Sequence, residues 1–122
     1  MLAPRAIVAL LVAAPLVAAA AGSQVNVSGT YDSNWDKVRL TQDGDRVRGT
    51  YVCCGGGTID GRIIEGRIIR YRWQQPSASG LGVWKIEPGG QLSGTWGTAS
   101  SDQDGGRWDL VLKQGGNGQI AQ

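Results

Sequence analysis

The sequence predicts an all-β protein folded as one small antiparallel up-and-down β-barrel of about eight strands. Apolar and polar residues alternate with a period of two from Val27 to Leu112, and Gly and Asp turn signals separate the alternating stretches. No stretch places apolar residues at helical spacing over two turns. A glycine also precedes a large aromatic by two residues at 29–31, 49–51, 82–84 and 94–96. Since side chains two apart share a strand face, each unit sets a gap beside a bulky ring, which suits the tapered interior of a small barrel.

The first 21 residues predict a secretory signal peptide. Arg5 precedes an apolar run that ends in small residues, and we expect cleavage between Ala20 and Ser23. An uncleaved membrane anchor is the alternative, and Pro15 within the apolar run argues against it. The alanine-rich leader is typical of bacteria. We therefore expect a mature chain that is secreted or periplasmic.

Residues 22–113 are long enough for one domain, and the polar, glycine-rich residues 114–122 are expected to form a flexible tail. We place the strands, in order, at 27–32, 36–42, 46–53, 58–64, 67–74, 81–87, 91–97 and 107–113. Four short turns, at 43–44, 55–57, 65–66 and 88–90, make successive strands antiparallel neighbours. Longer connections are expected at 75–80 and 98–106.

Alternation also divides the strands into an apolar inward face and a polar outward face. The inward positions hold most of the large apolar residues, which a closed barrel would bury. A β-sandwich with the same strand order is the alternative. The first and last predicted hairpins look like variants of one unit, and in a closed barrel they would lie side by side.

The segment 29–51, GTYDSNWDKVRLTQDGDRVRGTY, resembles the opening of avidin-type biotin-binding barrels. More loosely, the mature chain is similar to the calycin group of small β-barrels, which includes lipocalins and secreted bacterial metalloprotease inhibitors. In the avidin-type pattern Tyr51 corresponds to the tyrosine that hydrogen-bonds the biotin ureido oxygen. The serine two residues after that tyrosine is Cys53 here, and residues 32–36 replace the family's Asn-x-x-Gly-Ser loop. The resemblance therefore implies the fold more than the ligand.

The composition predicts that the protein is not an enzyme and has no resident metal or cofactor. The chain has no histidine, which excludes Ser-His and Cys-His pairs and ordinary zinc sites. Its carboxylate pairs, Asp43 with Asp45 and Asp102 with Asp104, stand in predicted surface loops that would desolvate neither acid.

Two adjacent cysteines, Cys53 and Cys54, are the only ones in the chain. In an oxidising compartment they can form a vicinal disulfide, and the glycines at 55–57 give the backbone the freedom that such a turn needs. Two free thiols and a bridge to another chain are the alternatives. A catalytic redox pair would more typically be Cys-x-x-Cys near a βαβ unit, and this chain has neither.

Aromatic residues provide the candidate ligand site. Indole and phenol combine an apolar body with a polar tip, which suits both barrel cores and ligand walls. Trp35 stands outside the strand pattern in the first loop, where it can close a barrel end or meet a ligand. The strand tryptophans also suit the core, which is the alternative for them. We predict a barrel mouth lined by Trp35, Tyr51, Trp73 and Trp96.

Outward arginines on the second to fifth predicted strands form a second candidate surface, which we call the basic wall. Such a wall can attract an anionic polysaccharide, a lipid headgroup or an acidic protein, with binding that weakens in salt. A solvated barrel exterior is the alternative. Nucleic acid is not expected, because no aromatics interleave these charges. The basic wall comprises Arg39, Arg46, Arg48, Arg62, Arg70 and Arg72.

These observations predict a binding protein that holds a small apolar or amphipathic ligand at a barrel mouth and does not span a membrane after signal cleavage. One alternative is a protein-binding module, such as a protease inhibitor, that uses residues 23–27 or the loops. Another is an envelope-surface structural protein that binds anionic polymer through the basic wall. The interior volume distinguishes these classes, because a filled barrel favours binding at its surface.

Overall fold

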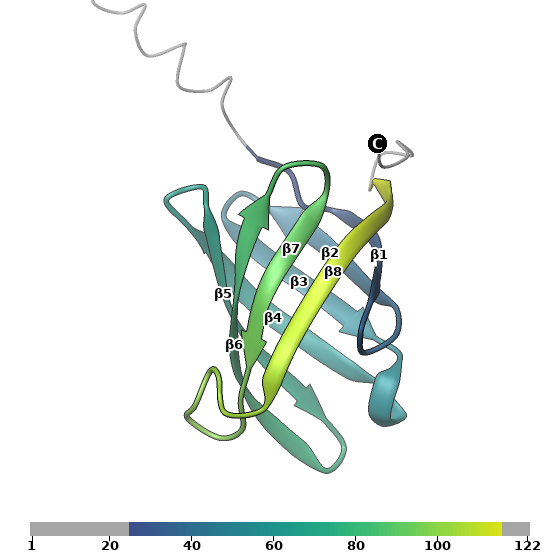
Figure 1. Cartoon of the computed structure of the whole chain (residues 1–122), viewed down its shortest axis with the longest axis vertical. Helices are drawn as coiled ribbons and strands as arrows, with labels where there is room; N and C mark the ends of the chain where they lie inside the picture. The colour runs from purple at the N-terminus through teal and green to yellow at the C-terminus, as the bar shows by residue number, and fades with distance from the viewer. Residues whose placement is uncertain (1–24, 116–122) are drawn as a thin grey trace, which may run out of the picture.

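The computed structural model describes residues 25–115 and is a closed barrel of eight antiparallel strands in sequential order (Figure 1). Each strand pairs with the next, and β8 pairs with β1 to close the barrel. The up-and-down barrel is therefore confirmed and the sandwich is excluded. The strands are β1 (Gly29–Ser33), β2 (Val38–Asp43), β3 (Arg46–Tyr51), β4 (Gly57–Ile64), β5 (Ile68–Gln75), β6 (Ala78–Glu87), β7 (Gln91–Trp96) and β8 (Gly106–Gly115).

Three local predictions need correction. Cys53 was placed in a strand, but it begins a short 3-10 turn, Cys53–Gly55, between β3 and β4. The long connection expected at 75–80 is a tight hairpin instead, because Gln75 pairs directly with Ala78. β8 continues to Gly115, where its pairing with Gly29 orders two residues of the predicted tail. The predicted signal peptide and residues 116–122 lie outside the described residues.

The barrel interior is filled by the side chains that alternation assigned to the inward face. Trp84 is fully buried and stacks on Tyr71, with 4.0 Å between ring centroids and 27° between planes. Every buried hydrophobic residue occupies a predicted inward position, which confirms the division into faces. The buried set comprises Val27, Tyr31, Val38, Leu40, Val47, Tyr51, Ile59, Ile69, Tyr71, Trp73, Trp84, Leu92, Trp108 and Leu110.

Glycines give the large rings room across strands rather than along them. Gly57 lies opposite Tyr51 and Gly82 lies opposite Tyr71, and a Cβ on either glycine would overlap the ring of its partner. The glycine of 94–96 has a different role, because a Cβ on Gly94 would collide with the backbone carbonyl of Val83. The prediction that glycines make room for large rings is therefore correct for Gly82, but the ring belongs to the neighbouring strand and not to the residue two positions along.

The two ends of the barrel are built differently. The β1–β2, β3–β4, β5–β6 and β7–β8 loops lie together at the lower end in Figure 1, which we call the mouth. The chain enters at the opposite end, which we call the closed end, where Val27 is buried just before β1. Within residues 25–115, none of the structure is a helix of the length and hydropathy needed to cross a bilayer.

Candidate functional site

An aromatic pocket occupies the mouth. It encloses about 80 Å³, and four of the five tryptophans of the chain contribute to its walls. The four side chains predicted to line a mouth are therefore brought together in one pocket. Sequence reasoning missed four further members of the wall. The full lining is Trp35, Tyr51, Cys53, Cys54, Trp73, Gln75, Trp96 and Trp108.

The rings of the pocket stand at right angles to their neighbours. Trp96 lies edge-on to both Trp35 and Trp73, with centroid separations of 5.6 Å in each pair and interplanar angles of 89° and 83°. On the other side, Tyr51 meets Trp108 at 5.2 Å and 83°. Flat rings set perpendicular to one another form box-like walls and leave a space that none of them fills. Such edge-to-face pairs are also favourable in themselves.

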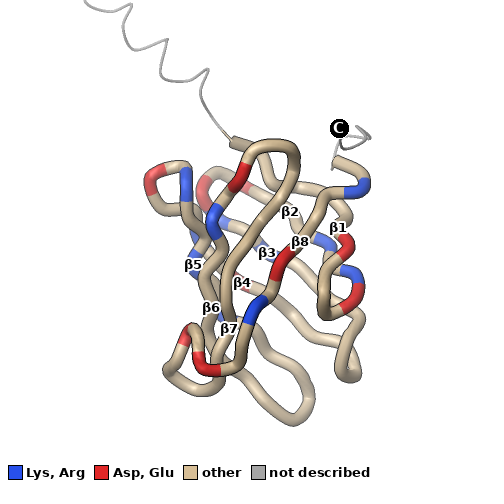
Figure 2. The backbone as a smooth tube through the Cα atoms, in the orientation of Figure 1, with Lys and Arg blue, Asp and Glu red and all other residues tan. Residues whose placement is uncertain are grey.

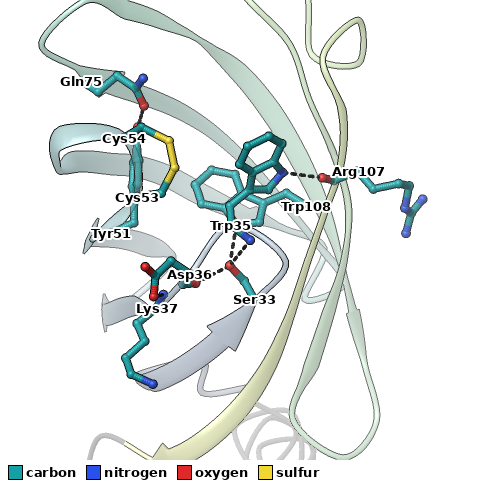
Figure 3. The surroundings of a disulfide bond; sticks show 10 residues. All are labelled: Ser33, Trp35, Asp36, Lys37, Tyr51, Cys53, Cys54, Gln75, Arg107 and Trp108. Atoms are coloured by element: carbon teal, nitrogen blue, oxygen red, sulfur yellow. Dashed lines mark hydrogen bonds between the residues drawn. A yellow bond between two sulfur atoms is a disulfide. The ribbon is translucent and has the colours of Figure 1, made fainter.

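Trp35 is a loop residue that the rest of the fold holds over the mouth. Its indole Nε1 donates to the carbonyl oxygen of Arg107 at 3.0 Å, and its neighbour Asn34 donates to the same oxygen at 3.0 Å. Asn34 also accepts the backbone N–H of Asp109 at 2.9 Å. The β1–β2 loop is therefore fastened to the start of β8, as Figure 3 shows for Trp35. The side chain of Trp35 nevertheless stays 40% exposed.

Three of the four indole N–H groups of the pocket are engaged in hydrogen bonds within the protein. Trp73 donates to the carbonyl oxygen of Gly97 at 2.9 Å, and Trp108 donates to the Ser33 hydroxyl at 3.1 Å. The Nε1 of Trp96 is buried and has no hydrogen-bond partner among the described residues. A ligand in the pocket consequently meets ring surfaces and C–H edges.

Tyr51 and Gln75 provide the polar atoms of the pocket. The Tyr51 hydroxyl donates to Gln75 Oε1 at 2.8 Å, so its proton is already engaged (Figure 3). Burial raises the pKa of Tyr51 to about 12, and its phenol therefore stays neutral at physiological pH. What remains available in the pocket from this pair is the lone-pair side of the Tyr51 oxygen and the amide N–H group of Gln75.

A vicinal disulfide joins Cys53 to Cys54 at the rim of the pocket (Figure 3). Of the three alternatives that the sequence left open, the structure therefore contains the intrachain bond. Cys54 adopts a left-handed backbone with φ of 68°, and Gly55 and Gly56 follow with φ of 89° each. The run of glycines permits this sharp turn, which places both cysteines in the wall of the pocket.

The basic wall lies on the outer surface of the barrel, separate from the mouth. Arg46, Arg62 and Arg70 are direct cross-strand neighbours on β3, β4 and β5. Together with Arg72 they line a shallow groove of about 480 Å³. Charged residues of both signs surround the barrel in Figure 2, and the wall contains its own carboxylate, Asp60.

Half of the basic wall is engaged in ion pairs. Asp60 accepts two hydrogen bonds from Arg46, at 3.2 and 2.9 Å, and these lower the pKa of that carboxyl. Arg62 pairs with Asp45 at 3.1 Å, and Arg70 lies 3.9 Å from Asp102. The remaining arginines, Arg39, Arg48 and Arg72, make no ion pair among the described residues.

The N-terminal arm considered for protein binding is partly inside the fold. Val27 is buried, and its carbonyl oxygen accepts the Tyr31 hydroxyl at 2.7 Å. Residues 23 and 24 lie outside the described residues. No group of three or more metal-ligating side chains gathers within residues 25–115.

Comparison of the chain with family models, curated proteins and solved structures returns no match. The resemblance of residues 29–51 to avidin-type barrels therefore stays a prediction, and the site is interpreted from its own geometry.

Proposed function

We propose that this protein is a secreted or periplasmic, non-enzymatic binding protein whose mouth pocket holds one small apolar or amphipathic group. The observation that carries the proposal is the enclosure of about 80 Å³ by five aromatic rings and a disulfide. Concave sites lined mainly by aromatic and apolar side chains with a few polar atoms are the usual form of small-molecule sites. Trp35 illustrates this point, because a loop tryptophan held in place yet 40% exposed has surface to offer a ligand.

The volume restricts what the pocket can hold. An engineered apolar cavity of about 150 Å³ binds benzene, and the pocket encloses about half of that volume. The barrel below it is filled by core side chains, so a ligand cannot enter deeper. The pocket therefore suits one compact group, with the rest of the ligand lying outside against Trp35. A ligand as large as a complete bicyclic vitamin does not fit within it.

Replacement of Trp35 tests the site. Trp35→Ala should reduce ligand affinity by more than about tenfold, because the exposed ring contributes contact area to the ligand. The melting temperature should change little, since the ring is 40% exposed and its removal costs one hydrogen bond to Arg107 and one edge-to-face contact with Trp96. Mass spectrometry of the native secreted protein identifies a copurified ligand, and a tryptophan-fluorescence titration measures its affinity.

Ile64 offers a matched control. It is also 40% exposed, but it ends β4 at the closed end of the barrel. Ile64→Ala should leave ligand affinity unchanged. Equal losses of affinity in Trp35→Ala and Ile64→Ala, or a large drop in melting temperature for Trp35→Ala alone, would show that Trp35 is a plug rather than a binding residue.

A second candidate function, binding of an anionic polymer at the basic wall, is favoured by one observation. Arg48 and Arg72, on the strands that also present Arg46 and Arg70, make no ion pair among the described residues, so their charge is available to an anion. Arg48→Glu with Arg72→Glu should abolish retention on an anionic polysaccharide column without breaking any ion pair of the fold. Retention that persists in the double variant and in 1 M salt, where screening is nearly complete, would reject this candidate.

A further inference from the structure

The pocket is lined by aromatic rings without any charged side chain, although charges are common elsewhere on the barrel. Residues 49–59 and 73–84, which supply two of the four mouth loops, contain no charged residue at all. The chain has five tryptophans and no phenylalanine, and tryptophan has the ring that attracts cations most strongly. Four of these tryptophans surround the pocket.

Most hydrogen-bond donors around the pocket are engaged within the protein or buried. The indole N–H groups of Trp35, Trp73 and Trp108 donate to protein oxygens, and that of Trp96 is buried. The Tyr51 proton is likewise given to Gln75. Apart from the amide N–H group of Gln75, the pocket thus presents π surfaces and an oxygen lone pair, both of which carry partial negative charge.

Positive charges near the mouth are held away from the pocket. The ammonium of Lys37 pairs with Asp32 at 3.0 Å, and the guanidinium of Arg107 pairs with Asp109 at 2.7 Å. Both side chains point away from the rings in Figure 3. Neither cation therefore occupies the pocket from within the chain, and an external cation of suitable size would meet no competing charge in its walls.

Resting on the proposed function, we infer that the group bound in the mouth pocket is an alkylated ammonium, such as the trimethylammonium of choline. A trimethylammonium group is compact and nearly spherical, which matches a box of perpendicular rings better than a flat or extended ligand does. Its charge is spread over methyl groups, so it costs less to desolvate than a primary ammonium. Aromatic walls then stabilise it by cation–π attraction.

The test compares choline with its neutral isostere, 3,3-dimethylbutan-1-ol, by tryptophan-fluorescence titration or calorimetry of the purified protein. The two probes have the same shape and differ in charge at one atom. We expect choline to bind on the order of tenfold more tightly than the alcohol. Equal affinities, or tighter binding of the alcohol, would overturn the inference and leave the proposed apolar site standing. If neither probe binds at millimolar concentration, a choline-type ligand is rejected, and a panel of neutral aromatic probes then tests the proposed function itself.

A variant pair isolates the contribution of the ring. Trp35→Leu keeps apolar bulk at the rim but removes the π surface, so the affinity for choline should fall by more than the affinity for the alcohol. Trp35→Phe should restore part of the preference for choline. The same loss for both probes in Trp35→Leu would show that only apolar contact matters and would overturn the inference.

A separate experiment decides whether the ammonium belongs to a lipid headgroup or to a soluble compound. Sedimentation with phosphatidylcholine vesicles, with phosphatidylglycerol vesicles as the control, reports whether the pocket reaches a choline headgroup in a lipid surface. Cosedimentation with the first alone, competed by free choline, assigns the ligand to lipid. Binding of free choline without cosedimentation assigns it to a soluble compound, and either result supports the inference. Equal cosedimentation with both vesicles that free choline does not displace would count against it.

Discussion

The mouth and the closed end finish the same barrel by different chemistry. At the closed end, Gln42 fastens the segment before β1, because its Oε1 accepts from Val27 N at 2.8 Å and its Nε2 donates to Val25 O at 3.0 Å. At the mouth, the corresponding closure consists of rings packed edge to face. Hydrogen bonds to the peptide leave a groove of about 610 Å³ on the surface of the closed end, with Asn26, Gln42 and Asp45 in its lining. Perpendicular rings leave a smaller space at the mouth that no charged side chain lines. The difference explains why the deeply apolar pocket lies at the mouth.

The largest effect on stability is expected from Trp108, the most deeply buried tryptophan of the mouth pocket. Trp108→Ala should lower the free energy of unfolding by about 3 to 5 kcal/mol, because it removes a buried indole that contacts Tyr51, Tyr71 and Trp84. Urea denaturation measures the loss. Trp35→Ala, at the rim of the same pocket, should cost far less. Similar losses of unfolding free energy in the two variants would mean that Trp35 supports the core as Trp108 does.

The closed end should depend on one side chain. Gln42→Ala removes hydrogen bonds to Val25, Val27 and Gly44, and it should destabilise the fold by about 1 to 3 kcal/mol. Thr41→Ala, one position along and outward, is the control and should be nearly neutral. Ligand affinity at the mouth should not change in either variant. A loss of affinity in Gln42→Ala would show that the two ends are coupled.

Alkaline pH tests both ends, since each has a buried tyrosine. Burial raises the pKa of Tyr31, at the closed end, and of Tyr51, at the mouth, from about 10 to about 12. Folding therefore favours the neutral phenol. The stability that this contributes is fully present below pH 10 and is lost as the pH rises through about 12.

The measurement is the urea midpoint as a function of pH. Tyr31→Phe and Tyr51→Phe should each make the decline above pH 10 shallower, by similar amounts because the two pKa values are raised alike. An unchanged midpoint between pH 9 and pH 12 in the unmodified protein would contradict the burial of both phenols.

The smallest effect on stability is expected from reduction of the disulfide. Because Cys53 and Cys54 are adjacent, the bond closes almost no loop and should contribute about 1 kcal/mol or less by restricting the unfolded chain. Its sulfur atoms line the pocket, however, so reduction should weaken ligand binding at the mouth. Thermal melts and titrations with and without reductant separate the two effects. A large drop in melting temperature with unchanged affinity would reverse this assignment.

Much of the fold could be predicted because it depends on residues close in sequence. Alternation places Tyr31, Trp84 and Leu110 on one face wherever their strands lie, and short turns fix the order of neighbours. The boundary errors occurred where backbone conformation departs from simple alternation. The cysteine turn is one case, because its left-handed residue interrupts a pattern that continues in the sequence.

The candidate site could be predicted only in part. Four lining aromatics were identified from their types and positions. Trp108, Gln75 and the two cysteines were not identified as part of the pocket wall. Trp108 was assigned to the core, and its burial agrees with that assignment even though one part of it meets the pocket. Which residues line the pocket depends on which ends of distant strands come together, and a local sequence pattern does not contain this information.

The sequence alone determined the order of the strands and their inner and outer faces, because period-two alternation and turn length are local properties. The closure of the barrel through β1 and β8 was decided by tertiary structure, since a sandwich with the same strand order satisfies the same local pattern. Tertiary structure decided which end stays open and how large the opening is. Trp35 reaches the carbonyl of Arg107 across 72 residues of sequence, and Gln42 reaches Val25 across 17. Such contacts form only after the barrel closes, which is why the volume of the pocket is a property of the closed barrel and not of any one segment.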